Sequence, residues 1–279
     1  MREVIIRVNL LATGGGFDLA LDANAPNDAW MLNIFNQRLC YEPEVVHVMS
    51  RAVRLGDICV DVGANVGFFT LLLAKLVGDG GHVTALEPGR NILARLKQNI
   101  SRNNVANVVL IEQPAWNKRE KIKFHLNADS TGGNAIWDPG LWEANEMSRA
   151  NPQSYEIEAV ALDDFVVPST RLIKIDTEGA EQRVLEGMEH ALKFYHPPFI
   201  IAELAPFGLE TLGCSGNSMR EYMHEFDYET FLIHPDGSLP SLVPPQTEIT
   251  YLNGQVVMNV LFSTVDDVGK IWTKVPYAD

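Results

Sequence analysis

The chain has 279 residues, of which 46% are hydrophobic and 21% are charged, a balance typical of a soluble globular protein built around one large domain. Its formal net charge is −14 and is spread along the chain, which counts against a nucleic-acid substrate because binding a phosphate backbone requires a basic surface. No apolar run is long enough to span a bilayer, the N-terminus does not resemble a signal peptide, and three sparse cysteines fit a reducing compartment, so we expect a cytoplasmic protein without a membrane span.

The N-terminal part of the chain combines turn residues with short helical patterns. The stretches GGG and NAPND are turn chemistry, so residues 1–27 are expected to be loosely organised. Apolar residues at helical spacing predict helices over 28–40 and 43–55. We interpret residues 1–55 as an N-terminal extension that belongs to the same unit as the main domain over 56–279.

From residue 56 onward, short apolar strands alternate with amphipathic or apolar helices. The predicted elements are a strand at 58–62, a helix at 68–77, a strand at 82–87, a helix at 91–104 and a strand at 107–112. Strands that alternate with helices over short connections are typical of a doubly wound, mostly parallel sheet. The fold class predicted from this pattern is therefore α/β and Rossmann-like.

An insertion at about 118–160 interrupts this alternation. Within it, 121–126 and 155–162 alternate polar and apolar residues, which predicts a hairpin of strands with one wet face at the edge of the sheet. The alternation then resumes with a strand at 171–176, a helix at 179–192, a strand at 198–204, a helix at 218–226, and closing strands at 228–233 and 256–262. We expect a closing strand to run antiparallel to the others.

The stretch GDICVDVGANVGFFTL at 56–71 places a carboxylate, a glycine turn and a helix start close together. Asp61 ends the predicted strand, and the turn from Gly63 to Gly67 leads into a helix, the position where open parallel sheets bind ligands. The third glycine of the dinucleotide fingerprint is missing, because Asn65 stands where that pattern needs glycine. No lysine and serine or threonine follow as in a P-loop, so both phosphate-binding motifs are disfavoured.

A second acid follows at the end of the next predicted strand, in TALEP at 84–88. Glu87 is placed to accept hydrogen bonds from both ribose hydroxyls of a nucleoside, in one crevice with Asp61. A ribose carboxylate and an open glycine turn, without a diphosphate loop, fit S-adenosylmethionine as the cofactor.

These motifs together resemble one methyltransferase family. VDVGANVGFFTLLLA, ALEP, LDDF at 162–165 and IKIDTEGAEQRVLEGM at 173–188 are similar to the FkbM-type family of S-adenosylmethionine-dependent methyltransferases, over roughly residues 41–262. The resemblance implies a class I Rossmann-like fold and methyl transfer to a hydroxyl of a small natural product, such as a polyketide, a peptide or a sugar.

The resemblance also implies roles for individual residues. The methionine part of the cofactor would be bordered by Asp61, Gly63, Ala64, Asn65, Gly67 and Phe68. Glu87, with Pro88 beside it, would hold the ribose, and Gln113 or Ala115 would lie near the adenine.

The candidate catalytic residues lie in IKIDTEGAE and on the next strand. Lys174 and Asp176 share one face of a strand, so Asp176 is a candidate base or polar orienter and Lys174 a candidate partner for it. Glu203 ends the following strand and is expected to open into the same crevice. Glu178, at a helix start, is assigned to substrate binding, with a plain helix-start role as the alternative. Several acids here could bind a divalent metal, but no spacing demands one and none is predicted.

The segment WDPGLWEANEMSRANP at 137–152 is an addition relative to the family pattern. Trp137 and Trp142 are interpreted either as a substrate lid or as a surface loop that covers an apolar edge.

Other functions remain open from the sequence: a nitrogen acceptor, a noncatalytic cofactor-binding module, or a nicotinamide-dependent oxidoreductase, which the missing glycine disfavours. The amide-binding loop usual in N-methyltransferases is absent after Asp176. The sequence names neither the acceptor nor the oligomeric state, and a homodimer is compatible with it.

Overall fold

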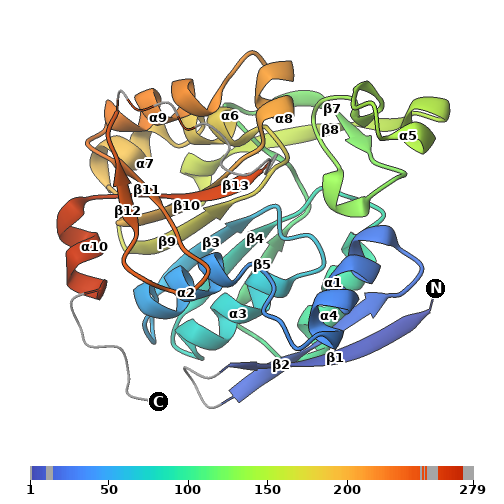
Figure 1. The fold of residues 1–279 in the computed structure, drawn as a ribbon, viewed down its shortest axis with the longest axis horizontal. Coiled ribbons are helices and arrows are strands. Elements are labelled where there is room, and N and C mark those ends of the chain that lie inside the picture. Colours follow the sequence, from blue (N-terminus) through green and yellow to red (C-terminus); the bar gives the residue numbers. More distant parts are fainter. Residues whose placement is uncertain (1, 11–14, 246, 248, 250–256, 273–279) are drawn as a thin grey trace.

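The computed structural model describes residues 2–10, 15–245, 247, 249 and 257–272, and its centre is a mixed sheet (Figure 1). Eight strands lie side by side in the order β12-β11-β13-β10-β9-β3-β4-β5. Their bounds are β3 (Ile58–Val62), β4 (His82–Leu86), β5 (Val108–Ile111), β9 (Thr170–Ile175), β10 (Phe199–Leu204), β11 (Glu229–Leu232), β12 (Ser241–Val243) and β13 (Met258–Ser263). The five strands from β10 to β5 pair in parallel, and β13 pairs antiparallel with β10, so the predicted parallel sheet with an antiparallel closing strand is confirmed.

Helices cover both faces of this sheet. The helices of the described residues are α1 (Pro26–Asn36), α2 (Pro43–Ala52), α3 (Phe68–Val77), α4 (Leu93–Arg102), α5 (Glu146–Ala150), α6 (Glu181–Glu186), α7 (Glu189–Phe194), α8 (Pro206–Thr211), α9 (Gly216–His224) and α10 (Val265–Trp272), with short 3-10 turns η1 (Thr131–Gly133), η2 (Pro139–Leu141) and η3 (Leu162–Asp164). Of these, α5 lies beside β7 and β8, away from the central sheet (Figure 1). Neighbouring residues of one strand face opposite layers: Ile201 packs with α2 and α3 residues, and Ile200 packs with α6 and α7 residues. Strands buried on both faces explain the continuous apolar runs of β3, β9 and β10.

The N-terminal residues form a hairpin, so the expectation of a loosely organised segment over 1–27 is wrong. Strands β1 (Glu3–Leu10) and β2 (Gly15–Asp22) pair antiparallel. Phe17 and Leu19 alternate inward from β2 and are fully buried, a period-two pattern that the glycines before them obscure. Asn99 of α4 fixes the hairpin, since its side chain accepts from the Ala20 N–H at 2.8 Å and donates to the Ala20 carbonyl at 3.1 Å.

The two strands of the insertion do not lie at the edge of the central sheet, contrary to prediction. They are β7 (Glu120–Leu126) and β8 (Gln153–Ala161), which pair antiparallel in a separate sheet of order β6-β8-β7. The short strand β6 (Ala115–Trp116) pairs in parallel with the end of β8. Because β5 is followed directly by β6, this small sheet lies beside the carboxyl ends of the central strands.

The helix predicted over 179–192 is divided into α6 and α7. Gly187 separates them, and a Cβ at this position would lie 2.1 Å from the Trp116 carbonyl oxygen. The break therefore allows the chain to pass close to β6. The spacing of apolar residues, from which the single helix was predicted, carries no information about this long-range contact.

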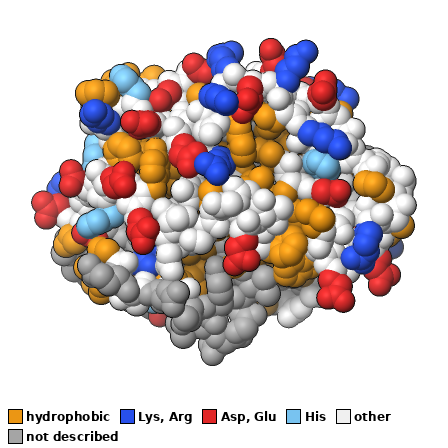
Figure 2. Space-filling view, turned by 90° about the horizontal axis from the view of Figure 1, so that it is seen from above, with side chains coloured by type: hydrophobic (Ala, Val, Ile, Leu, Met, Phe, Trp, Pro, Cys, Tyr) orange, Lys and Arg blue, Asp and Glu red, His pale blue; other side chains and the backbone are white. Residues whose placement is uncertain are grey.

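Figure 2 shows the face of the molecule above helices α6 to α9. Acidic and basic side chains are interspersed there, and the described residues do not gather into a basic stripe. In the described part of the chain, no helix combines the length and apolarity that crossing a membrane would need.

Candidate active site

A cavity of about 310 Å³ opens at the carboxyl ends of the parallel strands. Its walls come from the segments that follow β3, β4, β5 and β9, from Glu203 near the end of β10, and from α1, the residues just before α2 and the η1 turn. This is the edge at which doubly wound sheets bind ligands. The position of the cavity follows from the strand order, because the carboxyl ends of the five parallel strands lie at the same edge of the sheet.

The turn after β3 forms the floor of the cavity. Gly63 and Gly67 have φ values of 83° and 97°, and Asn65 has φ 50°, so three residues of the turn lie in the left-handed region. A Cβ at Gly63 would lie 1.7 Å from the Asp176 carbonyl oxygen. Only glycine fits there, because the turn after β3 and the segment after β9 touch through their backbones.

Glu87 is held rigidly beside this turn. Its Oε2 accepts from the Asn65 N–H at 2.8 Å and its Oε1 accepts from the Gly89 N–H at 2.7 Å. Burial raises the pKa of Glu87 to about 7, although these two N–H groups favour the charged form. Each oxygen keeps a second lone pair, so the carboxylate has the capacity to accept two ligand hydroxyls.

The far end of the cavity is mostly apolar. Pro88, Ile92, Ala115 and Phe124 line it, and Gln113 stands at its rim with its amide nitrogen 3.1 Å from the Glu158 carbonyl oxygen. An apolar slot beside a carboxylate that accepts hydroxyls fits the adenine and ribose of a nucleoside.

The structure places Asp61 differently from its neighbours in the motif. Its side chain is fully buried, is not among the described residues that line the 310 Å³ cavity, and accepts from the Thr70 hydroxyl at 2.5 Å. Burial raises the pKa of Asp61, and the Lys174 ammonium opposes that shift. Ala64 and Phe68 border a separate hollow of about 20 Å³ that also touches Lys174. The Asp61 carboxylate is therefore bound to α3 through Thr70 and does not line the cavity beside Glu87.

Lys174 and Asp176 form an ion pair at the end of β9. Lys174 Nζ lies 2.6 Å from Asp176 Oδ2, the lysine side chain is 1% exposed, and its ammonium lies 4.6 Å from the Phe69 ring centroid. Burial disfavours the charged lysine, but the carboxylates of Asp176, Glu42 and Asp61 outweigh burial and raise the Lys174 pKa. Lys174 is thus a fixed positive charge beneath the cavity.

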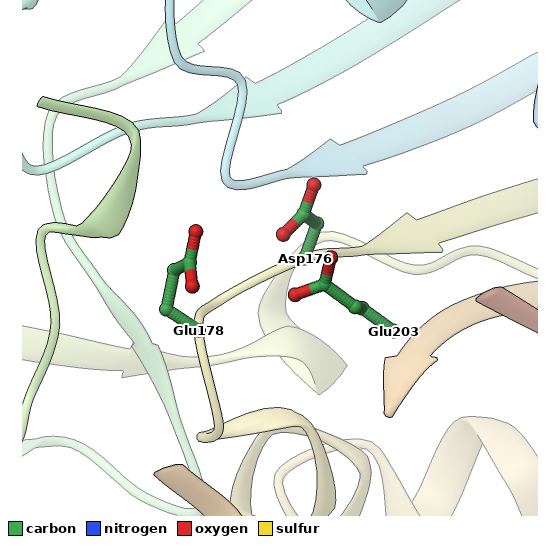
Figure 3. A group of neighbouring side chains, drawn as sticks. All are labelled: Asp176, Glu178 and Glu203. Carbon is green, nitrogen blue, oxygen red and sulfur yellow. The ribbon is translucent and has the colours of Figure 1, made fainter. Parts of the chain in front are cut away.

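The carboxylates of Glu178 and Glu203 converge with that of Asp176, and we call Asp176, Glu178 and Glu203 the acid trio (Figure 3). One oxygen from each lies within 4.8 Å of the others. Burial and the neighbouring carboxylates raise the pKa values of Glu178 and Glu203 well above their usual range. Glu203 Oε2 is buried and has no hydrogen-bond partner among the described residues. Glu178 has φ 57°, a strained backbone that aims its side chain into the site.

The acid trio offers three oxygen atoms, which is a ligand set that a divalent cation such as Mg²⁺ accepts. The same carboxylates serve equally well as hydrogen-bond acceptors for a substrate. The prediction that the protein uses no metal stays a prediction.

A family comparison decides the chemistry of this cavity. The model of the "Methyltransferase FkbM domain" matches residues 61–230, more than half of the chain. The chain belongs to the FkbM family of methyltransferases. Its mostly parallel α/β sheet is the Rossmann-like architecture that the sequence predicted, and its cofactor is S-adenosylmethionine.

Two curated relatives of this FkbM-family chain act on different kinds of molecule. The hexuronic acid methyltransferase AglP of Haloferax volcanii is 24% identical over 204 residues, which are 71% of this chain and 75% of that protein. The 31-O-demethyl-FK506 methyltransferase FkbM of Streptomyces tacrolimicus is 30% identical over 166 residues, 50% of this chain and 62% of that protein.

Among solved structures, methyltransferase FkbM from Methylobacillus flagellatus KT aligns with a TM-score of 0.44 at 16% identity, over 84% of this chain and 60% of that chain. M. jannaschii TYW2, solved in complex with AdoMet, aligns with a TM-score of 0.44 at 14% identity, over 95% and 88% of the two chains.

A second cavity, of about 260 Å³, adjoins the first in this FkbM-family protein. Trp137, Trp142 and Phe207 form its aromatic side, and the Trp137 indole N–H donates to the Glu178 carbonyl oxygen at 2.6 Å. The two tryptophans of the added segment thus line a cavity next to the acid trio. The sequence had left two interpretations of them open, a substrate lid and a surface loop that covers an apolar edge.

Sequence reasoning missed several residues of the site. Glu42, Asn27 and Thr131 line the larger cavity, and burial raises the Glu42 pKa to about 6. Glu42 belongs to the YEPE motif and has φ 38°, while Asn259 donates to its carboxylate at 3.1 Å. The YEPE motif, which resembles the family pattern, was the signal that could have identified Glu42. Because this motif is far in sequence from the strand ends, the sequence did not indicate that Glu42 lines the cavity.

Proposed function

We propose that this protein transfers the methyl group of S-adenosylmethionine to a hydroxyl oxygen of a small molecule, a polyketide, a peptide or a sugar. The observation that carries the proposal is Glu203 Oε2, a buried carboxylate oxygen without a partner, in a cavity built for a nucleoside cofactor. A hydroxyl acceptor must lose its proton on methylation, and a carboxylate with a raised pKa is a stronger base for that task than an ordinary carboxylate.

The residues present fit the cofactor. Glu87 would accept the ribose hydroxyls, Pro88 and Ala115 would contact the adenine, and the turn from Gly63 to Gly67 would border the methionine part. When bound, S-adenosylmethionine supplies an electrophilic methyl group whose leaving thioether is neutral, so the protein need not protonate it. What remains for the protein is to align the acceptor, exclude water and take one proton.

Glu203 is proposed as the proton acceptor, and Asp176 as the group that orients the acceptor hydroxyl. The two roles follow from their partners, because Asp176 is bound to the Lys174 ammonium and Glu203 Oε2 has no hydrogen-bond partner among the described residues. A carboxylate bound to an ammonium is a weaker base than one surrounded by other acids. Lys174 acts as a positioning residue that fixes Asp176.

The names of the two relatives support an oxygen acceptor, since one is named for position 31-O of its substrate and the other for a hexuronic acid. They do not share an acceptor scaffold, so the acceptor of this chain has to be derived from its own cavities.

The test is methyl transfer from isotopically labelled S-adenosylmethionine by the purified full chain, with matched alcohol and amine acceptors followed by mass spectrometry. We expect labelled methyl ethers and no N-methylated products. Labelled amines in place of ethers would overturn the oxygen acceptor, and binding of S-adenosylhomocysteine without turnover on any acceptor would favour a noncatalytic module.

A further inference from the structure

The second cavity continues from the cofactor cavity at the acid trio. Asn27, Gly132 and Glu178 line both cavities, so the two cavities adjoin and one acceptor molecule can extend from the second toward the first. The two volumes, about 310 and 260 Å³, are each large enough for a ring-sized fragment. This continuity makes the second cavity a candidate place for the methyl acceptor.

One side of the second cavity is an aromatic wall. The Trp142 and Phe207 rings meet edge to face at 4.6 Å between centroids, and Trp137 meets Phe207 at 5.3 Å. These contacts, with the hydrogen bond from Trp137 to the Glu178 backbone, fix the wall in place. A rigid aromatic wall binds the apolar face of a ring at little cost in conformational entropy.

Three unpartnered polar atoms belong to residues that line the cofactor cavity, and one of these residues, Asn27, also lines the second cavity. Asn27 Nδ2, Thr131 Oγ1 and Glu203 Oε2 are buried and have no hydrogen-bond partner among the described residues. Leaving buried polar atoms unpaired is costly, so three of them around one cavity indicate a polar ligand. One donor, one hydroxyl and one acceptor together match the hydroxyl groups of a polyol.

The ionisable side chains that line the two cavities are acidic. Among the described residues, neither cavity is lined by a lysine or an arginine, whereas the side chains of Glu42 and the acid trio are carboxyls. The nearest ammonium, that of Lys174, is bound to Asp176 and is 1% exposed. An anionic acceptor would therefore meet carboxyl groups and no cationic partner.

We infer that the second cavity selects a hydroxylated ring that is uncharged or carries an amine, and that it rejects a ring bearing a carboxylate or phosphate. The inference rests on the proposed methyl transfer and adds the charge class of the acceptor. It separates this chain from the relative that is named for a hexuronic acid. The apolar face of the ring lies on Trp142, and its hydroxyl groups face Asn27 and Glu203.

The test compares three probes that share one ring: methyl glucoside, methyl glucosaminide and methyl glucuronide. Binding to the full chain is measured by tryptophan fluorescence and saturation-transfer NMR, with S-adenosylhomocysteine present and EDTA in the buffer. We expect the glucoside and the glucosaminide to bind and the glucuronide to bind at least about tenfold more weakly, which corresponds to about 1.4 kcal/mol.

Two variants assign the effect to the proposed residues. Trp142→Ala should weaken all three probes by a similar factor and leave S-adenosylhomocysteine binding unchanged, while Phe194→Ala, which removes a 64% exposed aromatic ring elsewhere, should change neither. At a pH high enough to ionise Glu178, whose pKa is raised, Glu178→Gln should reduce the discrimination against the glucuronide, while the exposed Glu210→Gln on α8 should preserve it.

Three results would overturn the inference. They are equal or tighter binding of the glucuronide, glucuronide binding that appears only when Mg²⁺ replaces EDTA, and no binding of any probe at millimolar concentration. The second result would mean that the acid trio holds a cation that recruits an anionic acceptor. Each result leaves methyl transfer to other hydroxyl acceptors measurable, so failure of the charge filter is distinguishable from failure of the proposed function.

Discussion

Lys174 Nζ and Asp176 Oδ2 lie 2.6 Å apart at the end of β9, and this pair separates the packed core from the reactive cavity. On the core side, the lysine lies against the Phe69 ring and near the buried Asp61 carboxylate. On the cavity side, Asp176 joins Glu178 and Glu203. One buried ammonium therefore stabilises several acids that would otherwise repel one another.

Replacing this ammonium should destabilise the fold. Lys174→Met leaves a buried group of carboxylates without a cation, and breaking such a pair costs about 3–5 kcal/mol. The loss should be smaller at acid pH, because protonation of the remaining acids relieves their repulsion. Urea unfolding at acid and neutral pH measures the change, with the exposed Lys270→Met as control. An unchanged unfolding midpoint for Lys174→Met would contradict the assigned role.

Cofactor affinity should depend on the charge of Glu87. Glu87→Gln removes charge-assisted hydrogen bonds to the ribose, and we expect S-adenosylhomocysteine to bind roughly 10- to 100-fold more weakly, or about 1.5–3 kcal/mol. Because the pKa of Glu87 is raised to about 7, the affinity of the unaltered protein should also fall as the pH drops below that value. Calorimetry over a pH series measures both effects, and Glu112→Gln at the exposed end of β5 is the control. Affinity that is independent of pH would exclude Glu87 as the ribose ligand.

Turnover should depend on Glu203. Glu203→Gln preserves the side-chain shape but removes the proposed proton acceptor, so we expect turnover to fall by about 10²- to 10⁴-fold with cofactor affinity unchanged. In the unaltered protein the rate should rise with pH as Glu203 loses its proton, and this rise should lie at higher pH than for an ordinary glutamate because burial and the neighbouring carboxylates raise the Glu203 pKa. Labelled methyl transfer measures the rate, with Glu210→Gln as the matched control. Full turnover in Glu203→Gln would show that another residue accepts the proton.

The sequence identified the elements whose order is local and missed the contacts that depend on tertiary packing. β3 and α3 have the predicted bounds, because an apolar run and a glycine turn specify them directly. The hairpin of β1 and β2 was missed because its hydrogen-bond partner, Asn99, is distant in sequence. Glu42 was missed for the same reason, since it reaches the cavity from the start of α2, remote from the strand ends. The sequence correctly placed Asp61 at the end of a strand. It could not show whether the side chain at that position faces the packed core or the ligand cavity.

The protein without ligand should lose stability as the pH rises from acid to neutral. Burial raises the pKa of Glu181 from 4.5 to about 7, so the folded state binds more protons than the unfolded state between these values. The stabilisation is complete below about 4.5 and is lost as the pH rises through about 7. Glu181→Gln should reduce this slope, because one of the acids with a raised pKa no longer titrates, while Glu42 and Glu87 still contribute. The amide oxygen can still accept from the Thr177 and Gly179 N–H groups, and the exposed Glu189→Gln should leave the slope unchanged. Urea unfolding across this pH range measures the slope, and an equal slope in Glu181→Gln and the unaltered protein would contradict the role of Glu181.

The contact between Gly63 and the Asp176 backbone should be intolerant of any side chain. In Gly63→Ala the new methyl group would lie 1.7 Å from the Asp176 carbonyl oxygen, at a φ of 83° that L residues rarely adopt. The turn after β3 and the segment carrying the acid trio must then move apart, which changes the cofactor site and the acceptor site together. We expect a loss of at least about 3 kcal/mol of unfolding free energy, comparable to other severe backbone and packing defects, and loss of S-adenosylhomocysteine binding. Gly80→Ala is the matched control, since a Cβ at this position would have no other atom within 4 Å among the described residues. Thermal unfolding and calorimetry on the two variants separate the effects, and a stable Gly63→Ala protein with full affinity would show that the two segments do not need this backbone contact.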